Sequence, residues 1–212
     1  MTTQDPWWAH DIIVCLTFAR HRGPAHVLDA YGAAAEPVRE LTLQQARTTL
    51  PIAEGGVVLR TGVLGNGEWA FCHESGEPEG FKEAVLSRLS AGTEAVQLYS
   101  VNGMTTLERY RDGVRIESFE AGFPSTLRSG PDHPLWDAVQ VLPDRSTATQ
   151  AAEGVQAHLG VRIDGDVLEG PLPTAYLPPE RRAPLSSRAP AAPEDASSQG
   201  LGRLLPGLPP HP

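Results

Sequence analysis

The stretch that decides the fold is Gly56–Glu120, and its second half reads VQLYSVNGMTTLERYRDGVRIESFE at positions 96–120. Two dipeptides in it, Asn102–Gly103 and Asp112–Gly113, accept positive φ and therefore close two-residue hairpins. Gly65–Asn66–Gly67 closes an earlier hairpin in the same way. The alternation between these turns predicts antiparallel strands at 57–64, 68–74, 94–101, 104–111 and 114–120.

Two features indicate how this sheet is covered. The predicted strand Glu94–Val101 is apolar on both sides, which is typical of a central strand. Between the second and third strands, residues 80–90 carry Phe81, Val85, Leu86 and Leu89 at helical spacing. We therefore expect a helix that packs across one face of the sheet.

Helical spacing also predicts three short helices before the sheet. The first begins at Asp5–Pro6 and ends near His21–Gly23, since its apolar residues recur in two rows that suit a helix buried on two sides. The second covers residues 24–31. The third covers 43–50, because Thr42 and Gln45 match a capping box.

Two more helices follow the sheet and a Gly-, Pro- and Ser-rich loop at 121–131. One begins at Pro134, and the other begins with a second capping box, Thr147 and Gln150. From Pro171 onward, Pro, Ala, Ser and Gly dominate and no apolar periodicity persists. Such a segment buries too little apolar area to offset its ordering entropy, so we expect disorder there, above all in 178–212.

The expected fold is therefore α+β: an antiparallel sheet of about five strands, flanked by N- and C-terminal helices, with a disordered proline-rich C-terminal tail. We assign residues 1–170 to a single globular domain and 171–212 to the tail.

Composition limits the classes of partner. The chain has 212 residues and a net charge of −9, which argues against binding to nucleic acid. The N-terminus does not resemble a signal peptide, and no apolar run is long enough to span a bilayer. Cys15 and Cys72 lie among apolar neighbours, as buried reduced thiols do. We expect a cytoplasmic protein without a nucleic-acid or membrane partner.

The candidate site residues are Trp69, His73, Arg109 and Arg128. His73 shares a strand face with Trp69, whereas Cys72 points to the opposite face, so Cys72 and His73 cannot form a nucleophile–base pair. Arg109 lies beside Tyr110, and an arginine next to an aromatic ring can hold a carboxylate or a phosphate. The competing interpretation is a solvated sheet face in which Arg109 pairs with Glu117 across two strands. No metal or cofactor motif has the required spacing.

Several segments are similar to an uncharacterised family of small proteins that is common in high-GC filamentous bacteria. The most specific is Leu89–Val96, which reads LSAGTEAV. The others are Trp8 with Cys15–Phe18, Gly67–Phe71, Asp112–Gly113, and Phe119–Glu120 with Phe123–Pro124 and Arg128. The resemblance covers residues 7–170 and implies no catalytic residue, because the family has no assigned activity.

The leading hypothesis is a non-enzymatic intracellular binding module for a protein partner. An immunity or antitoxin role, in which an acidic face masks a basic toxin, is one concrete form of it. The alternative is a small-molecule-binding or hydrolytic enzyme with a pocket near Trp69, His73 and Arg109. A third possibility is a scaffold that recruits its partner through the C-terminal tail.

Overall fold

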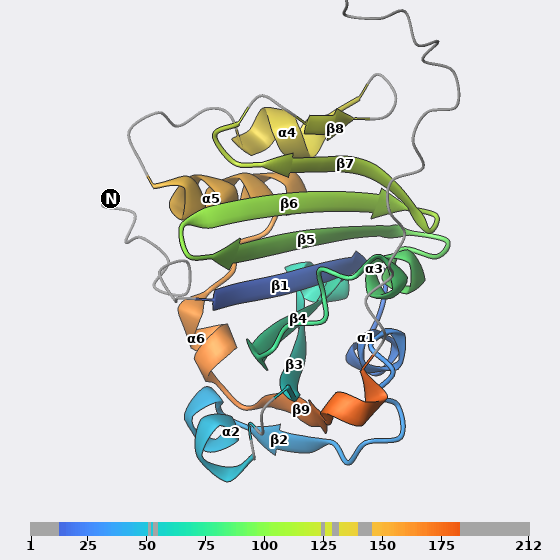
Figure 1. The fold of residues 1–212 in the computed structure, drawn as a ribbon, viewed down its shortest axis with the longest axis vertical. Helices are drawn as coiled ribbons and strands as arrows, with labels where there is room; N and C mark the ends of the chain where they lie inside the picture. Colours follow the sequence, from blue (N-terminus) through green and yellow to red (C-terminus); the bar gives the residue numbers. More distant parts are fainter. Residues whose placement is uncertain are drawn as a thin grey trace, which may run out of the picture.

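The computed structural model describes residues 13–50, 52, 55–123, 126–128, 132–139 and 146–182. Within this part of the chain, nine strands form one antiparallel sheet in the order β2-β9-β3-β4-β1-β5-β6-β7-β8 (Figure 1). The strands are β1 Ile13–Arg20, β2 Arg39–Leu41, β3 Val57–Leu64, β4 Trp69–Gly76, β5 Glu94–Val101, β6 Met104–Arg111, β7 Val114–Glu120, β8 Thr126–Arg128 and β9 Leu172–Leu177. The helices are α1 Pro24–Ala30, α2 Leu43–Thr49, α3 Glu83–Leu89, α4 Pro134–Val139, α5 Thr147–Leu159 and α6 Gly165–Glu169, with short 3₁₀ turns at Gly65–Gly67 and Pro179–Arg181.

The mixed helix and antiparallel-sheet architecture is confirmed, but the sheet is larger than the expected five or so strands. The predicted bounds of β3, β5, β6 and β7 match the observed strands. Both hairpin dipeptides adopt positive φ, with Asn102 at 51° and Asp112 at 52°. These angles are the ones that a two-residue turn of the right twist requires.

The first helix of the sequence analysis is wrong for residues 13–20, which form β1 at the centre of the sheet. Leu16 lies between His73 of β4 and Leu98 of β5, so β1 pairs with a neighbour on each side. A segment that is apolar on two sides suits a buried helix or a central strand equally well. Its β-branched and aromatic residues, and partners distant in sequence, favour the strand. The predicted start of this helix, Asp5–Pro6, lies outside the described residues.

The folded body also continues beyond the boundary predicted at residue 170. β9 pairs with β3 on one side and with β2 on the other, so Leu172–Leu177 is an internal strand. Beyond it, Arg182 forms ion pairs with Glu77 and Glu79 and donates to the backbone carbonyl oxygen of Gly55. The predicted tail was 171–212, and its part from 183 onward lies outside the described residues.

Two apolar cores lie on opposite faces of the sheet. We call them the α5 face, which α4, α5 and α6 cover, and the α1 face, which α1 and α3 cover. Alternate residues of β1 enter each core, with Leu16 and Phe18 on the α5 face and Ala19 on the α1 face. β5 contributes Val96 and Ala95 in the same manner, which confirms that it is a central strand.

The predicted capping box at the start of α2 is confirmed, whereas the N-cap of α5 is one residue earlier than predicted. At α2, Thr42 accepts from the Gln45 backbone N–H while the Gln45 side chain accepts from the Thr42 N–H, which is a complete capping box. At α5, the N-cap is Ser146 rather than Thr147, and its hydroxyl accepts from the Thr149 N–H. None of the helices in the described residues is long and apolar enough to cross a membrane.

The ion pairs after β9 predict where the chain can be shortened. Deletion of 183–212 should leave the melting temperature unchanged, because no contact described here is lost. Deletion of 179–212 should lower the free energy of unfolding by about 2 kcal/mol or more, because buried Glu79 loses Arg182 and Glu36 loses Arg181, 2.8 Å away. Thermal and urea unfolding measure both. Arg182→Ala in the full chain should reproduce part of the loss, and equal stability of the two truncations would contradict the assignment.

Candidate functional site

The short helix α4 separates two cavities at the β7 end of the sheet. It packs on α5 and β7, and both contacts place it over the α5 face. Gly154 of α5 permits this approach, because a Cβ there would lie 2.8 Å from the Cα of Val139. The aromatic cavity, of about 240 Å³, is lined by Phe119, Ala121, Gly122, Phe123, Trp136, Val139 and Gln150. The charged cavity, of about 500 Å³, is lined by Arg109, Arg111, Ile116, Asp132, His133, Pro134 and Asp137.

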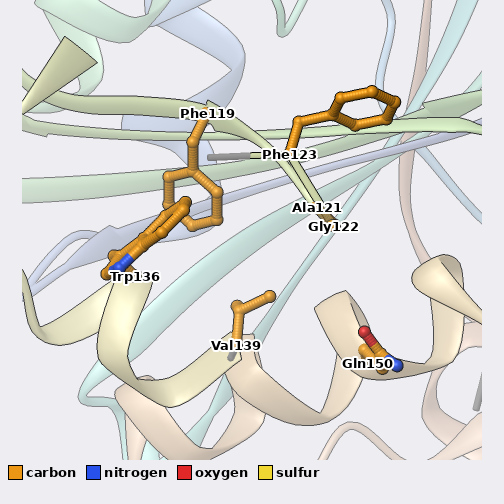
Figure 2. A pocket seen from close by; sticks show the side chains of 7 residues that line it. All are labelled: Phe119, Ala121, Gly122, Phe123, Trp136, Val139 and Gln150. Atoms are coloured by element: carbon orange, nitrogen blue, oxygen red, sulfur yellow. The ribbon is translucent and has the colours of Figure 1, made fainter. Parts of the chain in front are cut away.

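Aromatic rings from three segments define the aromatic cavity. The rings of Phe119 and Trp136 meet edge to face, with centroids 5.0 Å apart and planes at 83° (Figure 2). Gly122, at a φ of 87°, turns the chain after β7 and is followed by Phe123, which is 57% exposed. Figure 2 shows the Phe123 ring extending away from the other labelled side chains. Gln150 of α5 lies on the opposite side of the view from Trp136. The cavity is therefore apolar and open to solvent beside an exposed aromatic ring.

A buried ion network forms the floor of the charged cavity. Arg109, 3% exposed, donates through Nε to the carboxylate of Glu117. Its Nη1 lies 3.5 Å from Glu94 Oε1, and its Nη2 donates to the carbonyl oxygen of Asp132 at 3.3 Å. Glu117 also accepts from the Trp136 backbone N–H at 3.2 Å. One carboxylate therefore joins the floor of the charged cavity to the helix that carries the aromatic cavity.

Glu94 forms ion pairs with the other basic side chains of this network. Its Oε1 lies 2.8 Å from His158 Nε2, and its Oε2 lies 3.4 Å from Arg111 Nη2. Burial alone would raise the pKa of Glu94, but the hydrogen bond from His158 and the charges of His158, Arg109 and Arg111 together lower it to about 2. Glu94 is therefore ionised at neutral pH.

The structure separates three of the four predicted site residues, Trp69, His73 and Arg109. Trp69 is buried in the core of the α5 face, where the guanidinium of Arg20 lies 5.8 Å from its ring centroid. His73 is on the same face, four residues further along β4. Arg109 stands three strands away on β6 and lines the charged cavity, which includes neither Trp69 nor His73. β8 places the backbone of Arg128 opposite Glu117, and its side chain lies outside the described part.

His73 faces a buried arginine rather than a substrate cavity. The two residues are paired across β3 and β4, and Arg60 donates to the backbone carbonyl oxygens of Leu168, Leu41 and Gly170. Burial, followed by the charges of Arg60 and Arg47, lowers the pKa of His73 to about 4. His73 is therefore a neutral core residue at physiological pH, and Arg60 ties β3 to β2 and to the end of α6.

The two thiols lie on the α1 face around a buried carboxylate. Cys15 and Cys72 are free and buried, and burial followed by the charge of Glu74 raises the pKa of each thiol. Glu74 accepts from the backbone N–H groups of Glu79 and Gly80 and from the hydroxyl of Tyr31. This cluster fixes the loop after β4. Within the described residues, no group of three His, Cys, Asp or Glu side chains could hold a metal ion.

The predicted pairing of Arg109 with Glu117 is confirmed, but the solvated sheet face expected for it is wrong, because both side chains are buried. The rest of the site was not predicted. No sequence pattern singles out Trp136, and Phe123 lies in the predicted loop at 121–131, where only the family resemblance includes it. Asp132 and Asp137 carry no motif. An apolar ring in a Gly- and Pro-rich loop directly after a strand is the one signal that could have identified Phe123.

Comparison with known proteins gives one result. A family model described as a family of unknown function, DUF6461, matches residues 2–146. The match includes β1 through α4, and it ends before α5, α6 and β9. No curated protein and no solved structure matches the chain.

Burial of His73 predicts a pH dependence of stability. Its pKa is about 6.5 in the unfolded chain and about 4 in the folded chain, so the unfolded state binds the proton more tightly. The free energy of unfolding should therefore fall by about 3 kcal/mol as pH drops from 6.5 to 4. Urea unfolding across this range should show a flatter profile for His73→Gln. An unchanged slope in that variant would mean that another group is responsible.

The Arg109–Glu117 pair predicts a strong coupling between two buried charges. Arg109→Leu should cost about 3–5 kcal/mol, because it leaves the fully buried Glu117 carboxylate without its cation. Arg109→Leu with Glu117→Gln should be more stable than the single variant, since the glutamine oxygen still accepts from the Trp136 N–H. A urea-unfolding double-mutant cycle measures the coupling, and additive losses would exclude a direct interaction.

Proposed function

As the chain belongs to the family of unknown function DUF6461, no activity follows from its family, and we propose that it is a non-enzymatic binding module for a protein partner. The aromatic cavity is the observation that carries this proposal. It combines the Phe119–Trp136 pair with the exposed ring of Phe123. Aromatic side chains around a small recess are typical of the energetic centre of protein interfaces, where the partner excludes water on binding.

The size of the aromatic cavity favours one side chain of a protein over a whole metabolite. Its volume of about 240 Å³ is below the range of roughly 300–1,000 Å³ that small-molecule sites occupy. Trp136 is held from both sides, by its ring contact with Phe119 and by its backbone hydrogen bond to Glu117. A rigid recess of this kind loses little conformational entropy when a partner binds.

The acidity of the chain indicates the charge of the partner. A net charge of −9 attracts basic proteins and repels acidic ones. An immunity- or antitoxin-type role inside the cell, with a basic toxin as the partner, is one form of the proposal. Binding should then weaken as salt concentration rises.

The second candidate is a small polar ligand or substrate in the charged cavity, whose volume of about 500 Å³ suits one. Arg109 and Arg111 favour this candidate because both line the cavity. Of the side chains that act as nucleophiles in covalent hydrolysis, the described lining contains Asp132, Asp137 and His133 but no serine, threonine or cysteine. All three nitrogens of Arg109 are also engaged by Glu117, Glu94 and Asp132. We therefore favour the binding module.

The proposal can be tested with N-acetyl-phenylalaninamide as a probe for the aromatic cavity. In two-dimensional NMR titrations, the amide signals of Gly122 and Gln150 should shift, and Phe123→Ser should weaken the binding by about fivefold. Val114→Ser is the matched control, because Val114 is 62% exposed at the opposite end of β7. Shifts spread over the surface, or equal binding by both variants, would contradict the proposal.

The same variants test the native partner. Affinity capture from the native cell should recover a basic protein with the wild-type chain and with Val114→Ser. Phe123→Ser should recover less of it, and salt should weaken the complex. A protein captured equally by all three chains would not use the aromatic cavity, and it would count against this site.

A further inference from the structure

Two carboxylates of the charged cavity have no cationic partner within the part of the chain that the structure describes. The side chains of Asp132 and Asp137 are exposed, and neither forms an ion pair with another residue of the described part. The two arginines of the cavity are already paired, Arg109 with Glu117 and Glu94, and Arg111 with Glu94. Among the described residues around this cavity, the carboxylates of Glu94, Glu117, Asp132 and Asp137 therefore outnumber the guanidinium groups of Arg109 and Arg111.

We propose that the charged cavity binds a basic side chain of the same partner segment whose apolar side chain enters the aromatic cavity. This inference rests on the proposed function and names the chemistry of the partner. A guanidinium or ammonium group would neutralise Asp132 and Asp137. An acidic group would instead meet the carboxylates of Asp132 and Asp137, while Arg109 and Arg111 already pair with Glu117 and Glu94.

The walls of the charged cavity suit the stem of a long basic side chain. Ile116 and Pro134 are apolar, and they can cover the methylene groups of an arginine or a lysine. His133 contributes a ring nitrogen, Nδ1, that is buried and has no hydrogen-bond partner in the described part of the chain. Buried polar atoms normally form hydrogen bonds, so a donor group of the partner would supply the hydrogen bond that Nδ1 lacks.

The arrangement of the two cavities sets the spacing in the partner. They lie on either side of α4, and a helix with its side chains is about 10–12 Å across. An extended chain advances by roughly 3.1–3.3 Å per residue. The apolar and basic residues should therefore be three or four positions apart. An extended segment with this pattern can cross α4 and occupy both cavities at once, which couples their affinities.

Two matched peptides test the inference, Ac-Trp-Gly-Gly-Arg-NH₂ and Ac-Trp-Gly-Gly-Gln-NH₂, titrated into the full chain at low salt and followed by NMR. The arginine peptide should bind about fivefold more tightly than the glutamine peptide. The double variant Asp132→Asn with Asp137→Asn should abolish this difference. The double variant Asp164→Asn with Asp166→Asn should keep it, because it removes the same charge from exposed positions at α6.

The outcomes separate the inference from the function on which it rests. Equal binding of the two peptides to the wild-type chain would overturn the basic-residue inference and leave the aromatic cavity standing. Loss of the difference in both double variants would assign it to the overall charge, and would also overturn the inference. Binding of neither peptide would overturn the proposed use of the aromatic cavity and the inference together.

Discussion

The double-sided pairing of β1 is the constraint on which the rest of the molecule depends. In the described sheet, β1 lies between β4 and β5 and pairs with both. Without β1, the sheet would divide into β2-β9-β3-β4 and β5-β6-β7-β8. β1 also supplies both cores, with Phe18 on the α5 face and Ala19 on the α1 face. A single strand therefore joins two half-sheets and the two helical layers that cover them.

The two half-sheets differ in the partners of their buried arginines. In the first, Arg60 is neutralised by no carboxylate of the described part and is held by backbone carbonyl oxygens, which makes it a tie between strands. In the second, Arg109, Glu117 and Glu94 form a paired network that reaches the surface beside α4. The second arrangement adjoins the aromatic and charged cavities, where we propose that a partner binds.

What the sequence could predict was set by local chemistry. Turns such as Asn102–Gly103 and the capping box at Thr42 depend on neighbouring residues, and both are present in the structure. β1 and β9 depend on partners far along the chain, and their apolar runs do not distinguish a strand from a helix or a loop. The site divides in the same way. The Arg109–Glu117 pair follows from hairpin register, whereas Trp136 reaches Phe119 only through the packing of α4.

The position of β1 in the sheet has a consequence for synthesis of the protein. β1 leaves the ribosome before the other strands of the sheet. Its partners β4 and β5 end at Gly76 and Val101, and β9, which pairs with β3, follows at Leu172–Leu177. The β5–β6–β7 hairpins can form as soon as they emerge, since their pairings are local. β1 must wait with unsatisfied backbone groups until both neighbours exist. The nascent chain therefore carries an unpaired apolar strand until β5 has left the ribosome, and chaperones can shield it during this interval.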